Sequence, residues 1–239
     1  MYNHSISFII AGYNESENVF STVEEVWKVL NENFENFEII LINDGSKDNT
    51  FEKMKQCEEK YSNIKILDNL ININFGASVL RGLKAAQMEY VVYDAFDLPL
   101  KPHVFVEKFK RMINEELDVL VLERESYPCT FWRKITSNIN IILLKILFPK
   151  LTFKTPILNF TQIYKKNIID SIIPFSRSPI FVWPELVFRA KLAGMKVGNV
   201  ITKPYVKDIR KGAFGHPHDI IWGMYEMFRF RIRLWSKNI

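Results

Sequence analysis

The chain has 239 residues, 48% of them hydrophobic and 25% charged, which is typical of a folded globular protein and excludes a disordered chain. Its net charge of +5 favours an anionic partner such as a phosphorylated ligand, a membrane surface or nucleic acid. The basic residues form no recognised nucleic-acid-binding motif, so we expect no nucleic-acid partner.

The first hundred residues alternate short apolar runs with amphipathic helical patterns. We expect helices at 19–30, from a cap at Asp48 or Asn49 to about residue 61, and at 77–86, and strands at 5–10, 38–42, 64–67 and 90–93. This alternation predicts a parallel, doubly wound α/β sheet that binds its ligands at the carboxyl ends of the strands. Polar side chains gather at those expected ends, namely Asn14, Glu15, Asp44, Asp94 and Asp97.

The pattern changes after Pro102, where we expect a helix at 104–113 and a strand at 119–122. Residues 139–148 are strongly apolar but too few to span a bilayer, which takes about 20 residues. They suit either a core helix or a helix lying on a membrane surface. The basic and aromatic run 228–235 likewise suits a half-buried helix or contact with anionic lipid headgroups.

Two cysteines, Cys57 and Cys129, are too few for a disulfide framework and match no metal-ligand spacing. No charged-then-apolar leader opens the sequence. We therefore expect a cytoplasmic protein with reduced thiols. Whether it is free in the cytoplasm or attached to the inner face of the membrane stays open.

Six motifs follow one another between about residues 5 and 215. They are a strand and loop at 7–18, an Asn-Asp-Gly-Ser loop within 38–50, a loop with Asn74 and Gly76, Asp97 followed by Pro102, Pro184-Glu185-Leu186, and Arg210-Lys211-Gly212. In this order they resemble family-2 glycosyltransferases, most of all the dolichol-phosphate-mannose-synthase-like branch. The resemblance implies an open, mostly parallel α/β sheet of the GT-A type within residues 1–215. The nucleotide-sugar-binding half would be 1–102 and the acceptor half 103–215, before a basic aromatic segment at 216–239.

The resemblance also implies transfer of a sugar, expected to be inverting, from a UDP- or GDP-sugar to a lipid-linked or cell-envelope glycan. Asp44 would accept hydrogen bonds from the base or ribose, although an Asx-type turn onto Ser46 and Lys47 is an alternative. The residues expected to bind the donor are Ala11, Tyr13, Glu15, Asp44, Asn74, Gly76, Arg124 and Arg210. For Tyr13 and Glu15 the alternatives are a packed aromatic ring and a helix cap.

A divalent cation, Mg²⁺ or Mn²⁺, would neutralise the leaving diphosphate in such a reaction. The alignment of motifs puts Ala95 at the first position of the family's Asp-x-Asp motif and Asp97 at the second. Asp97 is therefore the expected metal ligand and a catalytic residue, whereas Asp94 would face the other way in a strand. We expect a weakened metal site, with Arg124 and Arg210 carrying part of the phosphate charge.

Glu185 follows a proline, so it belongs in the first turn of a helix. It is either a general base that deprotonates the acceptor hydroxyl or an acid that compensates the helix dipole. The competing interpretation of the whole chain is a non-catalytic GT-A-like module that binds a nucleotide sugar or a partner protein. Ala95 and Thr155, where the branch has acids, favour that module; the enzyme is favoured by Asp44, Asp97, Glu185 and Arg210.

Overall fold

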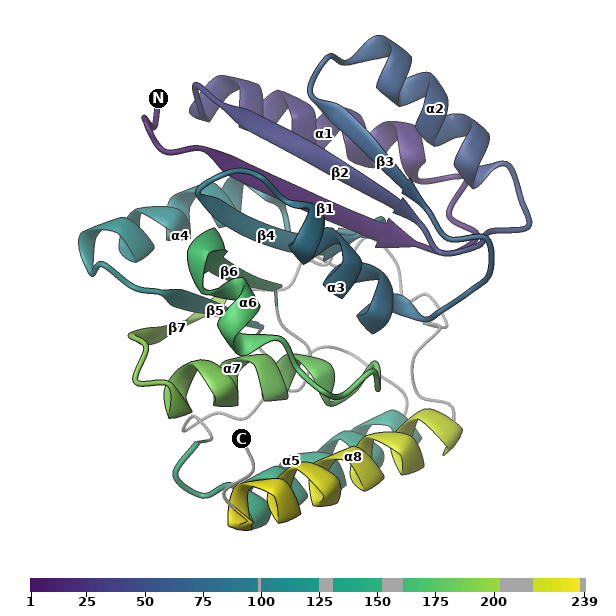
Figure 1. Ribbon diagram of the computed structural model, residues 1–239. Coiled ribbons are helices and arrows are strands. Elements are labelled where there is room, and N and C mark those ends of the chain that lie inside the picture. Colours follow the sequence, from purple (N-terminus) through teal and green to yellow (C-terminus); the bar gives the residue numbers. More distant parts are fainter. Residues whose placement is uncertain (99, 125–130, 152–160, 203–216, 237–239) are drawn as a thin grey trace.

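The computed structural model describes residues 1–98, 100–124, 131–151, 161–202 and 217–236. Its sheet has the strand order β3-β2-β1-β4-β6-β5-β7 (Figure 1). β6 is antiparallel to both neighbours and the other pairs are parallel, so the predicted mostly parallel α/β sheet is confirmed. The strands are β1 (Ile6–Gly12), β2 (Phe37–Asn43), β3 (Ile64–Asp68), β4 (Tyr90–Ala95), β5 (Val119–Arg124), β6 (Thr161–Lys165) and β7 (Val197–Thr202).

Helices cover both faces of the sheet (Figure 1). One face packs against α1 (Val19–Asn33), α2 (Thr50–Lys60) and α4 (Pro102–Asn114). The other packs against α3 (Phe75–Ala85), α6 (Ile169–Ile172), which follows a short 3₁₀ turn (Lys166–Ile168), and α7 (Val182–Leu192). The remaining helices, α5 (Phe131–Leu147) and α8 (Pro217–Trp235), lie side by side and form a third apolar cluster with α7.

The central strands are apolar on both faces because both faces are covered by helices. Along β1, Phe8 contacts the α1 and α4 layer, while its neighbour Ile9 contacts the α3 and α7 layer. Gly82 lets α3 lie close to the sheet, since a Cβ there would come within 2.7 Å of Ile9 and Ile42. This packing fixes α3 beside the carboxyl ends of β1 and β2.

The expected elements of the first half agree with the structure to within a few residues, whereas the second half differs more. α5 begins at Phe131, eight residues before the apolar run 139–148. Its first turns were not predicted because they are mixed in polarity. β6 and β7 were not predicted. β6 begins with the buried polar residues Thr161 and Gln162, and β7 is an edge strand whose exposure does not alternate clearly.

Cys57 is buried in the α1 and α2 layer, and this burial raises the pKa of its thiol to about 11. The thiol is therefore protonated and unreactive at neutral pH. Cys129 lies outside the described residues.

Candidate active site

The carboxyl ends of four parallel strands meet at one edge of the sheet. Gly12 at the end of β1 is paired with Asn43 at the end of β2, and Asn43 with Asp68 at the end of β3. On the other side of β1, Ala11 is paired with Ala95, the last residue of β4. The loops after these strands are therefore neighbours at the edge where open α/β sheets bind ligands.

Hydrogen bonds join the loop after β1 to the loop after β2. The Asn14 backbone N–H donates to Ser46 Oγ (3.0 Å), and the Lys47 N–H donates to Asn14 Oδ1 (2.8 Å). The Glu15 N–H donates to Thr50 Oγ1 (2.8 Å). These contacts join the two loops into one rim at the carboxyl edge of the sheet. Tyr13 lies on this rim and is 38% exposed.

Two of the predicted donor-binding residues lie in this region with other evident roles. Ala11 is fully buried in the sheet, where it is paired with Ile42 and Ala95, so its role in donor binding stays a prediction. The Glu15 carboxylate accepts a hydrogen bond from Asn18 Nδ2, just before α1. That contact is made to a side-chain amide and not to a backbone N–H of α1, so both the donor-binding role and the helix-cap alternative for Glu15 stay predictions.

Asp44 is 2% exposed and ties the loop after β2 to α3. Its Oδ1 accepts hydrogen bonds from Asn69 Nδ2 (3.1 Å), the Ile73 N–H (2.9 Å) and Ser78 Oγ (2.8 Å). The predicted turn onto Ser46 is instead closed by Asn43, whose Oδ1 accepts from the Ser46 N–H (3.1 Å). Asp44 thus shapes the rim, and direct contact with a nucleotide stays a prediction.

This burial leads us to expect that Asp44→Ala lowers the free energy of unfolding by about 3 kcal/mol, because a buried carboxylate loses three hydrogen bonds. In a chain of this size that corresponds to a fall in Tm of about 6–12 °C. Asp68→Ala, which removes one hydrogen bond from Asn43, should cost less. Thermal unfolding followed by circular dichroism measures both, and an unchanged Tm for the Asp44 variant would refute the role in the rim.

The loop before α3 packs directly against the loop after β2. Gly45 has a φ of +71°, and a Cβ there would lie 2.4 Å from the Ile71 carbonyl carbon. Asn74 caps α3, with its Oδ1 accepting from the Ala77 N–H (3.1 Å). Gly76 allows α3 to approach α7, where a Cβ would lie 3.0 Å from Val182. The positive end of the α3 dipole is therefore held at the edge, where it favours an anion such as a diphosphate.

A strained turn after β4 presents Asp97 to solvent. The turn is closed by the Leu98 N–H donating to the Ala95 carbonyl (3.0 Å), and Leu98 has a φ of 40°, uncommon for this residue type. Burial of Leu98 and a bond from Thr22 Oγ1 to the Phe96 carbonyl (2.6 Å) anchor the turn. Asp97 itself is exposed and makes no hydrogen bond to another described residue, so its carboxylate is open to a ligand.

Asp94, by contrast, is a buried residue of β4. Its Oδ1 accepts from the Ala95 N–H (2.8 Å) and its Oδ2 from Thr161 Oγ1 (3.4 Å). Within the described ranges no three His, Cys, Asp or Glu residues gather as a metal site. The exposed carboxylate of Asp97 could supply one ligand to a cation whose other ligands are donor oxygens and water, and this role stays a prediction.

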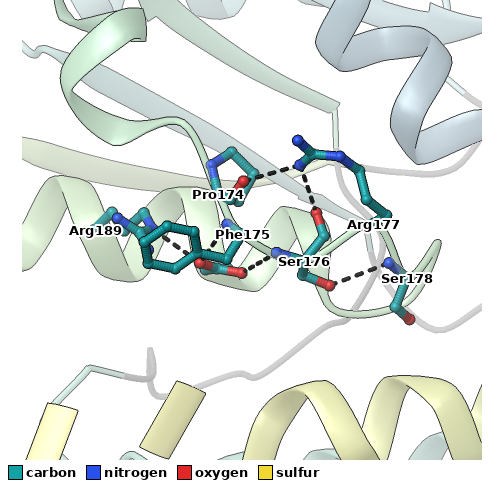
Figure 2. A network of polar contacts seen from close by, with 7 residues as sticks. Pro174, Phe175, Ser176, Arg177, Ser178 and Arg189 are labelled. Carbon is teal, nitrogen blue, oxygen red and sulfur yellow. Dashed lines mark hydrogen bonds and ion pairs between the residues drawn. The ribbon is translucent and has the colours of Figure 1, made fainter. Parts of the chain in front are cut away.

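Glu185 lies in the first turn of α7, as predicted, but is only 1% exposed. Its carboxylate accepts from the Phe175 N–H (2.9 Å), the Ser176 N–H (2.8 Å) and Arg189 Nε (2.8 Å). Figure 2 shows the segment that it holds. The Phe175 ring in turn contacts the guanidinium groups of Arg189 (4.2 Å) and Arg233 (4.1 Å), which connects α7 with α8.

These contacts make Glu185 an anchor for residues 174–178, and its burial argues against the predicted role as a general base.

Arg124 ends β5, but its side chain lies outside the described residues, as do Thr155 and Arg210 in their entirety. The roles predicted for the two arginines stay predictions. Sequence reasoning missed Asn69 and Ser78, although a serine on the apolar face of a helix is a usable signal of a buried polar contact.

The fold is that of GT-A glycosyltransferases of known structure. Glucosyl-3-phosphoglycerate synthase from Mycobacterium tuberculosis, solved with Mn²⁺ and UDP, superimposes with a TM-score of 0.66 at 14% identity, covering 96% of this chain and 79% of that one. The mannosyltransferase PcManGT from Pyrobaculum calidifontis, solved with GDP-Man and Mn²⁺, gives a TM-score of 0.68 at 12% identity, covering 98% of this chain and 65% of that one.

The sequence comparison is more specific. A family model described as "Glycosyl transferase family 2" matches residues 7–179, so the chain belongs to this family. A dolichol-phosphate mannosyltransferase from Pyrococcus furiosus is 30% identical in an alignment of 179 positions that covers 70% of this chain and 48% of that protein. The chain thus spans about half the length of this relative, and the predicted likeness to the dolichol-phosphate-mannose-synthase branch is confirmed.

Proposed function

We propose that the chain transfers a hexose, with inversion, from a UDP- or GDP-sugar to a lipid-linked or cell-envelope glycan acceptor. The observation that carries this proposal is the exposed carboxylate of Asp97 at the carboxyl edge of the sheet. The family match and the sugar nucleotides named for two structural neighbours support it.

In this proposal the joined loops bind the donor. Tyr13 stacks on the base, and the diphosphate lies near the start of α3, where the helix dipole and the predicted Arg124 and Arg210 oppose its charge. Asp97 would hold a divalent cation, whose chemistry is to neutralise charge on the leaving diphosphate. Because Ala95 supplies no carboxylate, we propose that the cation is held weakly and keeps much of its water shell.

The contacts of Glu185, in the proposed acceptor half, favour an acceptor whose attacking oxygen is already anionic. Glu185 is enclosed by two backbone N–H groups and Arg189, so it does not offer a free oxygen to an acceptor hydroxyl. A phosphate-bearing acceptor needs no general base, since its attacking oxygen carries the charge already. We therefore favour an acceptor phosphate on a membrane lipid, and a protein that works at the cytoplasmic face of the membrane.

Nucleotide binding tests the donor half of the proposal. UDP and GDP are titrated by calorimetry in the presence of Mn²⁺, and one of them is expected to bind. Tyr13→Ala should weaken that binding by about tenfold, because aromatic stacking on a base contributes about 1–3 kcal/mol. Phe20→Ala, which alters an exposed aromatic side chain on α1, is the matched control. If neither nucleotide binds, the proposed donor is wrong.

One observation favours the second candidate, a non-catalytic module that binds a nucleotide sugar or a partner protein. Ala95 stands where the family's first motif aspartate is expected. The carboxylate of Asp94 beside it already accepts hydrogen bonds from Thr161 Oγ1 and the Ala95 N–H. Such a module would bind the nucleotide and turn over no donor.

A further inference from the structure

The exposed apolar side chains of the chain are concentrated on two helices. Half of the large apolar residues that are exposed in the described part of the chain lie on α5 and α8. Those of α5 are Ile139, Ile142 and Ile146, and those of α8 are Ile221, Tyr225, Phe228, Ile232 and Trp235. Concentrated apolar exposure of this kind marks an interaction surface.

The spacing places these side chains in one stripe on each helix. On α8 they recur after four, three, four and three residues, and on α5 after three and four, which keeps them on one side of a helix with 3.6 residues per turn. The opposite sides, with Leu144 and Phe148 at the end of α5 and Met227 and Phe230 on α8, are buried against α7. The two helices lie side by side at the foot of the molecule in Figure 1.

The exposed charge around the stripes is positive. Lys145 and Arg231 are exposed, and Arg229, which pairs with Glu226, is 45% exposed. The acids of α8 are less exposed, with side-chain exposures of 20% for Asp219 and 9% for Glu226. α5 contains no acidic residue. An apolar stripe bordered by cations is the pattern of a helix that lies in the interface of an anionic membrane.

We propose that α5 and α8 together form a docking surface for an anionic lipid bilayer, with both helices lying flat and their stripes in the headgroup boundary. A second copy of the chain fits less well, because a two-fold interface would set this positively charged surface against the same positively charged surface of its mate. Among the described residues no helix is long and apolar enough to cross a membrane. The docking surface is independent of the transfer chemistry.

The test is co-sedimentation of the full chain with vesicles of phosphatidylcholine, alone or mixed with phosphatidylglycerol. The chain is expected to sediment with the mixed vesicles and to be released by salt, which shortens the screening length to about 8 Å near physiological ionic strength. Ile221→Gln combined with Ile232→Gln should lower binding to the mixed vesicles by more than about tenfold. Arg231→Gln should weaken binding to the mixed vesicles and leave any binding to pure phosphatidylcholine vesicles unchanged.

Ile201→Gln is the matched control, because Ile201 is an isoleucine 52% exposed on β7, away from both helices. It should sediment like the parent, and the melting temperature of each variant shows that it is folded. A parent that stays in solution with mixed vesicles would overturn the proposal. The proposal would also be overturned if sedimentation equilibrium showed the parent to be a dimer that the double substitution dissociates, while neither the parent nor any variant bound vesicles.

Discussion

Glu185→Ala is expected to lower the free energy of unfolding by about 4 kcal/mol, since removing one partner of a buried ion pair leaves the other charge uncompensated. Two backbone N–H groups, of Phe175 and Ser176, lose their acceptor at the same time. Arg189 would lose its carboxylate partner while its buried Nη2 has no hydrogen-bond partner in the part of the chain that the structure describes. A fall in Tm of about 8–16 °C follows for a chain of this length.

The chain offers a control in the exposed pair Arg111 and Glu115, which has the same four-residue spacing, in reverse order, at the end of α4. Glu115→Ala should cost less than about 0.5 kcal/mol, because exposed pairs of this kind contribute little. Thermal or urea unfolding compares the two variants. If they cost the same, Glu185 is not the anchor of residues 174–178, and a role in catalysis becomes the better explanation.

Asp97→Ala is expected to reduce donor turnover on the order of 100-fold, the effect of losing a group that stabilises charge in the transition state. The Tm should stay nearly unchanged, since Asp97 is exposed and makes no hydrogen bond to a described residue. Release of nucleoside diphosphate from the sugar donor measures turnover. Asp170→Ala, which removes an exposed carboxylate from α6, should leave turnover unchanged.

Ala95→Asp tests the proposed weakness of the metal site. If Ala95 stands at a vacant ligand position, adding a carboxylate there should lower the Mn²⁺ concentration that gives half-maximal turnover. Tight and saturable metal dependence in the parent would contradict this account, because it would require a ligand beyond Asp97.

The first half of the fold was predictable because its strands are buried on both faces and its helices are amphipathic, so the periodicity is clear. The place of Asp97 after the end of β4 could be predicted because it follows such a strand; its exposure is what a ligand needs, and the role itself stays a prediction. The three hydrogen bonds to Asp44 could not be found, since they depend on how closely the loops pack around Gly45. For Glu185, the sequence shows a first-turn acid but not the segment 174–178 folding back over it.

The most direct test of the central claim is nucleoside diphosphate release from a panel of UDP- and GDP-sugars, measured with the parent and with Asp97→Ala at several Mn²⁺ concentrations. Family-2 glycosyltransferase chemistry at this edge predicts slow hydrolysis of one donor class by the parent and loss of that hydrolysis in the variant. If the parent binds UDP or GDP but hydrolyses no donor at any Mn²⁺ concentration, with or without lipid vesicles, the chain is a nucleotide-binding module rather than a transferase.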